Sequence, residues 1–341
     1  MKKTIITALI CFALASAMPT AAYAMELVVG GQPVGIQLNT DGVMVAGLAS
    51  IETAEGKKSP AADAGFRQGD IIIKIGERKV SCAADFIDAV AALNGKSAPV
   101  TALREGKAVE MTVQPVLSAE NQWMLGMWLR DGLSGIGTLT FCDPDSGIYG
   151  ALGHSVNDED SGVILPLGDG SISSAEIVGI VPGSQGAPGE LTGAADTGQI
   201  LGSVEKNTEK GIYGHSYVNF SGKVVETGQI QPGSASIIST INGKEPREYA
   251  VEINRVYSER GCTRVMLTVT DPELRAATGG IVQGMSGSPI LQNGCLVGAV
   301  THVFVNDPTK GYGISIQDML ETAEIQDKAA SKILSQRRKP M

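Results

Sequence analysis

Short runs of alternating apolar and polar residues, each ended by a turn signal, recur through most of this chain. In the run from Tyr249 to Arg255 the apolar side chains fall at every second position, and the run from Arg264 to Thr270 repeats the pattern. Successive side chains of a β-strand point to opposite faces, so each run predicts a half-buried antiparallel strand. Together with 43 glycines and only 4% aromatic residues, these runs predict a mainly β protein with a few helices.

At 341 residues the chain is long enough for two domains. We expect the first over residues 28–116, with one helix near Ala83 to Leu93. A connector around Leu117 to Gln122 separates it from the second domain, expected over residues 123–341. Most of the glycines lie in this second part, which predicts a β-barrel or a pair of barrels. We expect it to end in a helix from about Gln317 to Leu334.

The first 24 residues predict export. Lys2 and Lys3 precede an apolar run from Thr4 to Met18, and the Ala22-Tyr23-Ala24 ending suits signal peptidase. Cleavage or later release is favoured over a retained membrane anchor, because Pro19 and the short apolar run fit a signal better than a transmembrane helix.

Charge and cysteine content exclude two classes of function. Removing residues 1–24 takes away two lysines and no acidic residue, which leaves 25 basic and 36 acidic residues and a net charge of −11. Nucleic acid is therefore not an expected partner. The four remaining cysteines, Cys82, Cys142, Cys262 and Cys295, form no CxxC pair, so no metal site is predicted, while one disulfide and buried free thiols are both open.

The expected first domain carries a recognisable order of segments. Ser59-Pro-Ala-Ala-Asp-Ala-Gly is followed by Gln68-Gly-Asp-Ile-Ile, and a loop enters a strand at Val34, Gly35, Ile36, Gln37 and Leu38. In these segments it resembles a PDZ domain of the kind attached to bacterial envelope proteases. The resemblance implies a peptide-binding site at residues 34–38, because backbone N–H groups beside an exposed strand edge can hold a terminal carboxylate. An ordinary glycine turn before a strand is the alternative.

The stretch GGIVQGMSGSPI, from Gly279 to Ile290, places Ser286 among glycines. A serine hydroxyl is a poor nucleophile unless a base takes its proton and donors hold the developing oxyanion. Flanking glycines let the N–H groups of Gly284 and Ser286 point at one site, as in chymotrypsin-like enzymes, whose GDSGGP the GMSGSP pattern resembles. The α/β-hydrolase elbow does not fit, because Ser288 stands where it requires glycine. Taken alone, the stretch is also typical of a structural turn.

A catalytic base must come from three histidines. His154 precedes Ser286 by 132 residues, and His-first, Ser-last is the order of chymotrypsin-like enzymes. His215, in IYGHSYVNF, is the rival, with an ordinary strand or loop role as its alternative. His302 follows Ser286 in the next strand, where it could line the specificity pocket and read a polar substrate side chain, or be a core histidine.

The acid that would orient the base stays open at this point. Asp271 lies 15 residues before Ser286, Asp196 lies 42 residues after His154, and Asp158 lies four residues after His154. Spacing alone does not choose among these three aspartates.

Three longer segments carry a more specific likeness: YGALGHSVND, TDPELRAATGGIVQGMSGSPI and GAVTHVFVNDPTKGYGI. With the PDZ-like region and the export signal, they closely resemble the SpoIVB peptidases, the stage IV sporulation serine proteases of endospore-forming bacteria. The resemblance implies a chymotrypsin-like double β-barrel after the PDZ domain. It also implies a serine endopeptidase without a cofactor, with His154 as base, Ser286 as nucleophile and Asp271 as acid.

The family resemblance further implies a place and a partner. Members are exported from the forespore into the space between two membranes, cleave themselves, and cut a membrane-bound regulator so that an intramembrane protease can activate a late sigma factor. Their PDZ domain restrains self-cleavage and recognises the target. Here the short segment Met25 to Gly31 leaves little room for a long self-cleaved piece. A non-catalytic PDZ scaffold is the competing hypothesis, and an envelope esterase is a weaker third.

Overall fold

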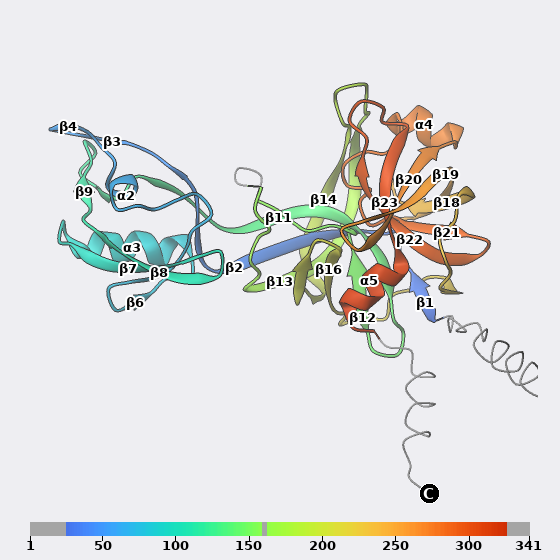
Figure 1. The fold of residues 1–341 in the computed structure, drawn as a ribbon, viewed down its shortest axis with the longest axis horizontal. Coiled ribbons are helices and arrows are strands. Elements are labelled where there is room, and N and C mark those ends of the chain that lie inside the picture. The colour runs from blue at the N-terminus through green and yellow to red at the C-terminus, as the bar shows by residue number, and fades with distance from the viewer. Residues whose placement is uncertain (1–24, 159–161, 326–341) are drawn as a thin grey trace, which may run out of the picture. The chain divides into compact units, whose positions relative to one another are not determined.

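The computed structural model describes residues 25–158 and 162–325, so the predicted signal at residues 1–24 lies outside the described residues (Figure 1). Within this part of the chain strands predominate, as predicted, and they build three hydrophobic cores. No helix of the described residues is long and apolar enough to cross a membrane.

The N-terminal core packs one helix against an antiparallel sheet. Helix α3 (Ala83–Leu93) has the predicted bounds and buries Phe86, Ala89 and Val90 on one face, the spacing of an amphipathic helix. It ends where Asn94 adopts a left-handed φ of 48°. The other elements around this core are β3 (Ile51–Thr53), β4 (Gly56–Lys58), α2 (Pro60–Asp63), β5 (Ile71–Ile75), β6 (Arg78–Lys79), β7 (Ala98–Arg104), β8 (Lys107–Val113), β9 (Val116–Leu117) and β10 (Trp123–Met124).

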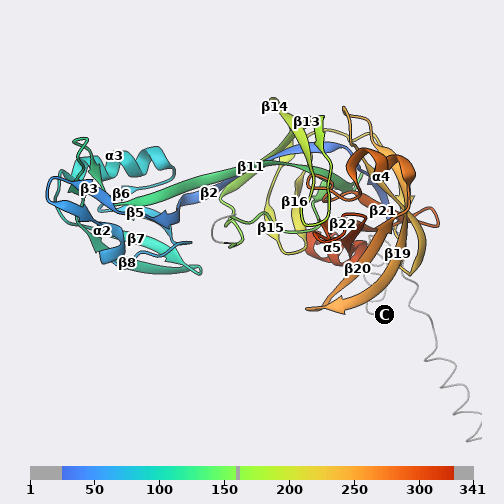
Figure 2. The same ribbon diagram turned by 90° about the horizontal axis from the view of Figure 1, so that it is seen from above.

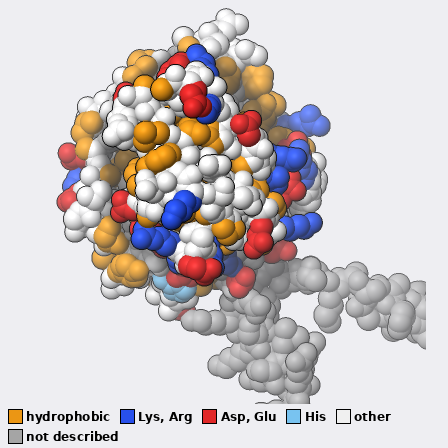
Figure 3. All heavy atoms as spheres, turned by 90° about the vertical axis from the view of Figure 1, so that its left-hand side faces the viewer, with side chains coloured by type: hydrophobic (Ala, Val, Ile, Leu, Met, Phe, Trp, Pro, Cys, Tyr) orange, Lys and Arg blue, Asp and Glu red, His pale blue; other side chains and the backbone are white. Residues whose placement is uncertain are grey.

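The surface seen from the side of these elements mixes charges of both signs. In Figure 3 acidic and basic side chains are interspersed with hydrophobic ones, and neither sign gathers into one large patch. Such a surface gives no electrostatic footprint of a polyanion-binding face.

Two long strands, β2 (Pro33–Leu48) and β11 (Met127–Cys142), contribute to two cores each. They pair antiparallel from Met127 opposite Leu48 to Thr138 opposite Pro33, and both views show them side by side (Figures 1 and 2). Val43 and Val45 of β2 lie in the N-terminal core, whereas its first half lies in the middle core. The two cores are therefore joined by continuous, hydrogen-bonded strands.

The middle core is covered by a sheet of seven further strands. These are β1 (Glu26–Val29), β12 (Ile148–Ala151), β13 (Asp169–Val181), β14 (Glu190–Ser203), β15 (Lys206–Thr208), β16 (Gly211–His215) and β17 (Val224–Glu226). Strand β11 pairs with β12 on its far side, and β12 pairs with β16. This sheet curls into a half-barrel without closing on itself.

The prediction of a peptide-binding loop at Val34, Gly35, Ile36, Gln37 and Leu38 is wrong for this structure. These residues lie inside β2, with β11 hydrogen-bonded along one edge and β13 along the other. A peptide can add only to a free edge, and here both edges are taken. The local pattern resembles a PDZ loop, but the pairing with β13 depends on residues more than 130 positions away in the chain.

The barrel core fills a closed barrel of six strands. In barrel order they are β18 (Gly233–Ser239), β19 (Arg247–Glu259), β20 (Cys262–Val269), β23 (Lys310–Ser315), β22 (Cys295–Val303) and β21 (Pro289–Gln292). The two predicted alternating runs lie in β19 and β20, and their apolar residues are buried as predicted. In β20 these are Val265, Leu267 and Val269, fully buried and each stabilising the fold by about 1.5–3 kcal/mol.

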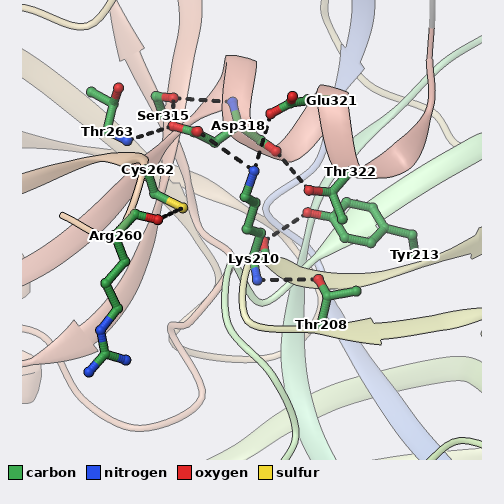
Figure 4. A network of polar contacts seen from close by, with 10 residues as sticks. All are labelled: Thr208, Lys210, Tyr213, Arg260, Cys262, Thr263, Ser315, Asp318, Glu321 and Thr322. Carbon is green, nitrogen blue, oxygen red and sulfur yellow. Dashed lines mark hydrogen bonds and ion pairs between the residues drawn. The ribbon is translucent and has the colours of Figure 1, made fainter. Parts of the chain in front are cut away.

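The last described helix, α5 (Ile316–Ala323), packs where the closed barrel meets β12 and β16. The Ser315 side chain caps its start, and Lys210 forms ion pairs with Glu321 at 3.2 Å and Asp318 at 3.9 Å (Figure 4). The helix begins one residue before the predicted Gln317, and the predicted part beyond residue 325 lies outside the described residues. The four cysteines of the described chain are unpaired.

Candidate active site

Helix α4 (Pro272–Thr278) leads the chain into the segment that carries Ser286. It ends at Gly279, where φ is +78°, the left-handed conformation that commonly terminates a helix. The chain then turns at Gly280, where a Cβ would lie 2.0 Å from the carbonyl oxygen of Pro308. Glycine is required at this turn because any side chain would collide with that backbone.

Ser286 itself lies between a buried methionine and a second obligatory glycine. Met285 is fully buried in the barrel core, and Gly287 has a φ of +95°. A Cβ at Gly287 would lie only 2.1 Å from the carbonyl oxygen of Thr138 on β11. The glycines therefore allow the backbone of this loop to pack closely against β11. Ser286 lines a cavity.

This cavity, about 500 Å³ in volume, is lined by Ser286, His154 and His302 together. His154 and Ser286, 132 residues apart in the sequence, thus meet at one place. The apolar side chains of its walls are Ile36, Leu133, Ile136, Leu152, Val156, Pro188, Val282, Val303 and Val305. Of the described residues, no Asp, Glu, Lys or Arg lines it.

The hydrogen bonds of His154 and Ser286 show which of their atoms donate. The Nδ1 atom of His154 lies 2.7 Å from the carbonyl oxygen of Ser155, which can only accept, so Nδ1 carries a proton. The Nε2 atom of a neutral imidazole is then the free base. The Ser286 hydroxyl donates to the carbonyl oxygen of Thr301 at 2.6 Å, so it must turn away from Thr301 before His154 can take its proton.

Two backbone N–H groups beside Ser286 are available for an oxyanion. Within residues 25–158 and 162–325, the N–H groups of Gly284 and Ser286 donate to no acceptor. The carbonyl before each is held: Gln283 accepts from the Leu191 N–H at 2.9 Å, and Met285 accepts from the Ser288 N–H at 3.0 Å. Because N–H and C=O point in opposite directions across a trans peptide, these bonds set where both free N–H groups point. The arrangement has the donors that an oxyanion hole needs.

Burial keeps the histidines of the cavity neutral. Desolvation lowers the pKa of His154 below its ordinary 6.5, although its bond to Ser155 works in the opposite direction. Desolvation of the imidazole also lowers the pKa of His302, to about 4, and the positive charge that a protonated His154 would carry and the charge of Arg264 act in the same direction. The two rings lie 4.5 Å apart between centroids, so a proton on one opposes a proton on the other. A neutral His154 is the form that can act as a base.

Comparison with known families identifies the family of this chain. The family model "SpoIVB peptidase S55" matches residues 121–320, more than half of the chain, and a PDZ domain model matches residues 34–114. The chain belongs to the SpoIVB peptidase family. It is a serine endopeptidase whose peptidase domain follows a PDZ domain, which excludes the non-catalytic scaffold.

Two solved structures are also similar to this SpoIVB-family chain. Both are of the Rv3671c protease of M. tuberculosis. The active form is 12% identical over 57% of this chain and 76% of that chain, with a TM-score of 0.33. An inactive serine-to-alanine mutant is 11% identical over 56% and 81% of the two chains, with a TM-score of 0.32. A likeness this distant carries no argument about activity.

Other predicted site residues of this SpoIVB-family peptidase lie outside the cavity. His215, the rival base, is exposed and pairs through Nδ1 with Glu205 at 2.8 Å. Asp196 is exposed on β14 and accepts only a local bond from the Gly198 N–H at 3.1 Å. Neither residue contacts His154 or Ser286.

The two remaining candidate acids are engaged elsewhere. The Asp271 carboxylate accepts from the Leu274 N–H at 3.0 Å, capping helix α4, and does not line the cavity. Asp158 is fully buried and forms an ion pair with Arg130 of β11. The structure therefore joins Ser286, His154 and His302 but brings none of the three predicted aspartates to them.

Three positions of the site were missed from the sequence: the carbonyl groups of Ser155 and Thr301, and the side chain of Thr138, which donates to Gly284 O at 2.9 Å. Backbone carbonyls carry no residue-type signal at all. Thr138 sits in an ordinary strand pattern, so only its tertiary neighbours reveal it.

Proposed function

We propose that Ser286 is the nucleophile and His154 the base of peptide-bond hydrolysis in this peptidase. The Ser286 hydroxyl swings from Thr301, gives its proton to Nε2 of His154, and Oγ attacks the substrate carbonyl carbon. The N–H groups of Gly284 and Ser286 hold the resulting oxyanion. His154 then protonates the leaving amine, and a water that it deprotonates next releases the acyl group and restores Ser286.

One observation carries this proposal: His154 and Ser286 line a single cavity beside two N–H groups without an acceptor among the described residues. The Ser155 carbonyl supports it by holding Nδ1–H of His154 in the tautomer that leaves Nε2 free. In a Ser-His-Asp triad a carboxylate performs this task. In this structure a backbone carbonyl does so.

The test uses a fluorophosphonate probe and a self-cleavage assay on residues 25–341. Ser286→Ala should abolish labelling and lower self-cleavage by a factor on the order of 10⁶. Ser288→Ala is the matched control, because its hydroxyl bonds Ser239 at 3.0 Å inside the core. Labelling that persists in Ser286→Ala, or self-fragments from both chains, would contradict the assignment of Ser286.

The cavity also favours a class of substrate residue. Its walls hold nine apolar side chains and no ionic side chain of the described residues, and an unpaired charge entering such a site is costly to desolvate. We therefore expect cleavage next to uncharged, mainly aliphatic residues. A peptide library with Val, Leu, Lys or Asp before the cut tests this, and preferred cleavage after Lys or Asp would contradict it.

We further propose the biological role that the family implies: export, self-cleavage, and cutting of a membrane-bound regulator during sporulation, so that an intramembrane protease activates a late sigma factor. The family membership of residues 121–320 and the signal-like pattern of residues 1–24 support this role. The site of action would be the space between the two membranes of the developing forespore. The PDZ domain would hold either the target or the chain itself.

Incubating the protein with a membrane-embedded regulator from a spore-forming host tests this role. Cleavage by the native chain, and not by Ser286→Ala, is the expected result. Fractionation of sporulating cells should place the chain outside both cytoplasms. A native chain that stays active on peptides but cuts no regulator would contradict the proposed role while leaving the peptidase assignment intact.

A further inference from the structure

Thr138 of β11 contacts the Ser286 loop but does not line the cavity. It is only 3% exposed and lies opposite Pro33, which has no N–H to offer. Its own N–H donates instead to the carbonyl oxygen of Ser286 at 3.0 Å, and its hydroxyl donates to the carbonyl oxygen of Gly284 at 2.9 Å. One residue therefore holds the loop on both sides of the nucleophile.

These two bonds fix the peptide groups on either side of the one that carries the Ser286 N–H, a donor of the proposed oxyanion hole. The N–H of Ser286 belongs to the peptide group between Met285 and Ser286. The peptide group before it carries the Gly284 carbonyl, and the one after it carries the Ser286 carbonyl. With both neighbouring planes held by Thr138, the central plane has little freedom to rotate, since each peptide group is rigid. An oxyanion donor is effective only when it is aimed before the reaction begins.

We propose that Thr138 is a positioning residue of the reaction, whose hydroxyl aims the oxyanion-hole N–H groups by holding the Gly284 carbonyl. This inference rests on the proposed role of Ser286. Leu133 and Ile136 of β11 and Val303 of β22 line the cavity from outside the Ser286 loop. A Thr138 substitution that shifts this loop should therefore slow the reaction with a probe more than it weakens binding of the probe. Thr140, which donates to Gly287 O at 2.8 Å, continues the same row of bonds.

The experiment measures fluorophosphonate labelling of residues 25–341 by intact mass at several probe concentrations. This yields a maximal rate and a half-saturating concentration without a known substrate. Thr138→Val keeps the shape of the side chain and removes the hydroxyl. We expect its maximal rate to fall by about 10- to 100-fold, with a half-saturating concentration within about twofold of the native value, because the phosphoryl oxygen occupies the oxyanion site. Thr138→Ser, which restores a hydroxyl, should recover most of the rate.

Thr240→Val is the matched control. Thr240 is equally buried, at 3% exposed, and its hydroxyl donates to a glycine carbonyl, Gly31 O, at 3.0 Å without lining the cavity. It should label at the native rate. If Thr138→Val does not fold, the comparison is made between Thr138→Ala and Thr138→Ser instead.

Three outcomes would overturn the inference. Labelling of Thr138→Val at the native rate would show that the Thr138 hydroxyl does not orient the oxyanion-hole N–H groups. Equal losses in Thr138→Ser and Thr138→Val point to packing of the methyl group instead. If the probe does not label the native chain, both this inference and the proposed role of Ser286 are overturned. If the native chain is labelled but either of the first two results is found, this inference alone is overturned.

Discussion

At the scale of single residues, identical side chains acquire different chemistry from their surroundings. His154 and His302 lie in one cavity, and desolvation lowers the pKa of each, while His215 sits in the open beside Glu205. Burial favours the neutral form of both cavity histidines, and His154 in addition has a carbonyl, that of Ser155, beside its Nδ1.

We predict that activity persists at mildly acidic pH. His154 serves as base only when it is unprotonated, so activity is lost as pH falls through its folded-state pKa, which desolvation places below 6.5. The measurement is the rate of fluorophosphonate labelling between about pH 4 and pH 8. Arg264→Gln is the informative variant, because the Arg264 charge lowers the pKa of His154, and its removal should move the midpoint upward. An acidic midpoint at or above 6.5 in the native protein would count against this.

We predict that Asp271 acts through helix α4 and not through the imidazole. Its carboxylate accepts the N–H groups of Leu274 at 3.0 Å and Ala250 at 3.3 Å. Asp271→Asn retains an acceptor and a good N-cap, so labelling within about tenfold of native is expected. Asp271→Ala loses the cap and should lower the free energy of unfolding by about 0.5–2 kcal/mol in urea denaturation. A loss on the order of 10⁴ in Asp271→Asn, with native stability, would instead identify Asp271 as the orienting acid.

At the scale of elements, β11 holds both the Ser286 loop and the loop that follows His154. Its Thr138 bonds the Ser286 loop, and its Arg130 pairs with Asp158, four residues after His154. The neighbouring Asp131 accepts the N–H of Ala83 at the start of helix α3 at 2.8 Å. A single strand thus contacts three segments that are distant in the sequence, which makes its own pairing with β2 central to the site.

We predict that the ion pair between Arg130 and Asp158 behaves as a coupled unit. The Asp158 side chain is 0% exposed and that of Arg130 is 29% exposed. Arg130→Met removes the guanidinium that pairs with the buried Asp158 carboxylate. It should lower the free energy of unfolding by about 3–5 kcal/mol. The double variant Arg130→Met with Asp158→Leu should recover most of that loss, because the buried Asp158 carboxylate is removed as well.

The measurement is a double-mutant cycle in urea, with labelling of Ser286 followed in parallel. Labelling should slow in Arg130→Met, because the ion pair with Asp158 anchors the loop that carries His154. It should stay slow in the double variant, which regains stability but also lacks this ion pair. Strictly additive effects of the two substitutions would contradict the coupling.

At the scale of the whole molecule, the peptidase domain is not a contiguous piece of the chain. Residues 34–39 of β2 lie between β11 and β13 in the middle of the sheet, and β1 pairs with both β11 and β17. The match to the peptidase family nevertheless starts only at residue 121. Strand β1, which precedes the PDZ match, and the first half of β2, which lies inside that match, thus complete the sheet whose strand β12 leads to His154.

We predict that residues 121–341 do not fold alone. Without β1 and β2, the middle core loses Val34, Ile36 and Leu38 and leaves the edges of β11 and β13 unpaired. Unpaired buried backbone groups are too costly for a stable sheet. Circular dichroism during heating measures this, with residues 25–341 as the control, which should melt cooperatively. A cooperative transition of the shorter fragment would contradict the prediction.

Much of the fold was predictable because it depends on local periodicity. The alternation in β19 and β20 predicts which side chains enter the barrel, and the spacing along Ala83–Leu93 predicts α3 with its bounds. Helix α5 was predicted at its start, since the apolar spacing begins there. The loop at residues 34–38 was mispredicted, because a local pattern cannot show that a second strand occupies an edge.

By itself the sequence determined the strand pattern, the glycines that allow the backbone to bend around Ser286, and the family pattern that names His154 and Ser286. These follow from side-chain periodicity and from residue types that only certain backbone conformations accept. The tertiary structure alone decided which N–H groups are left free, which carbonyl holds His154, and that Asp271 caps a helix. Such facts depend on contacts like that of Thr138 with Gly284, 146 positions apart, and no local pattern encodes where two distant segments meet.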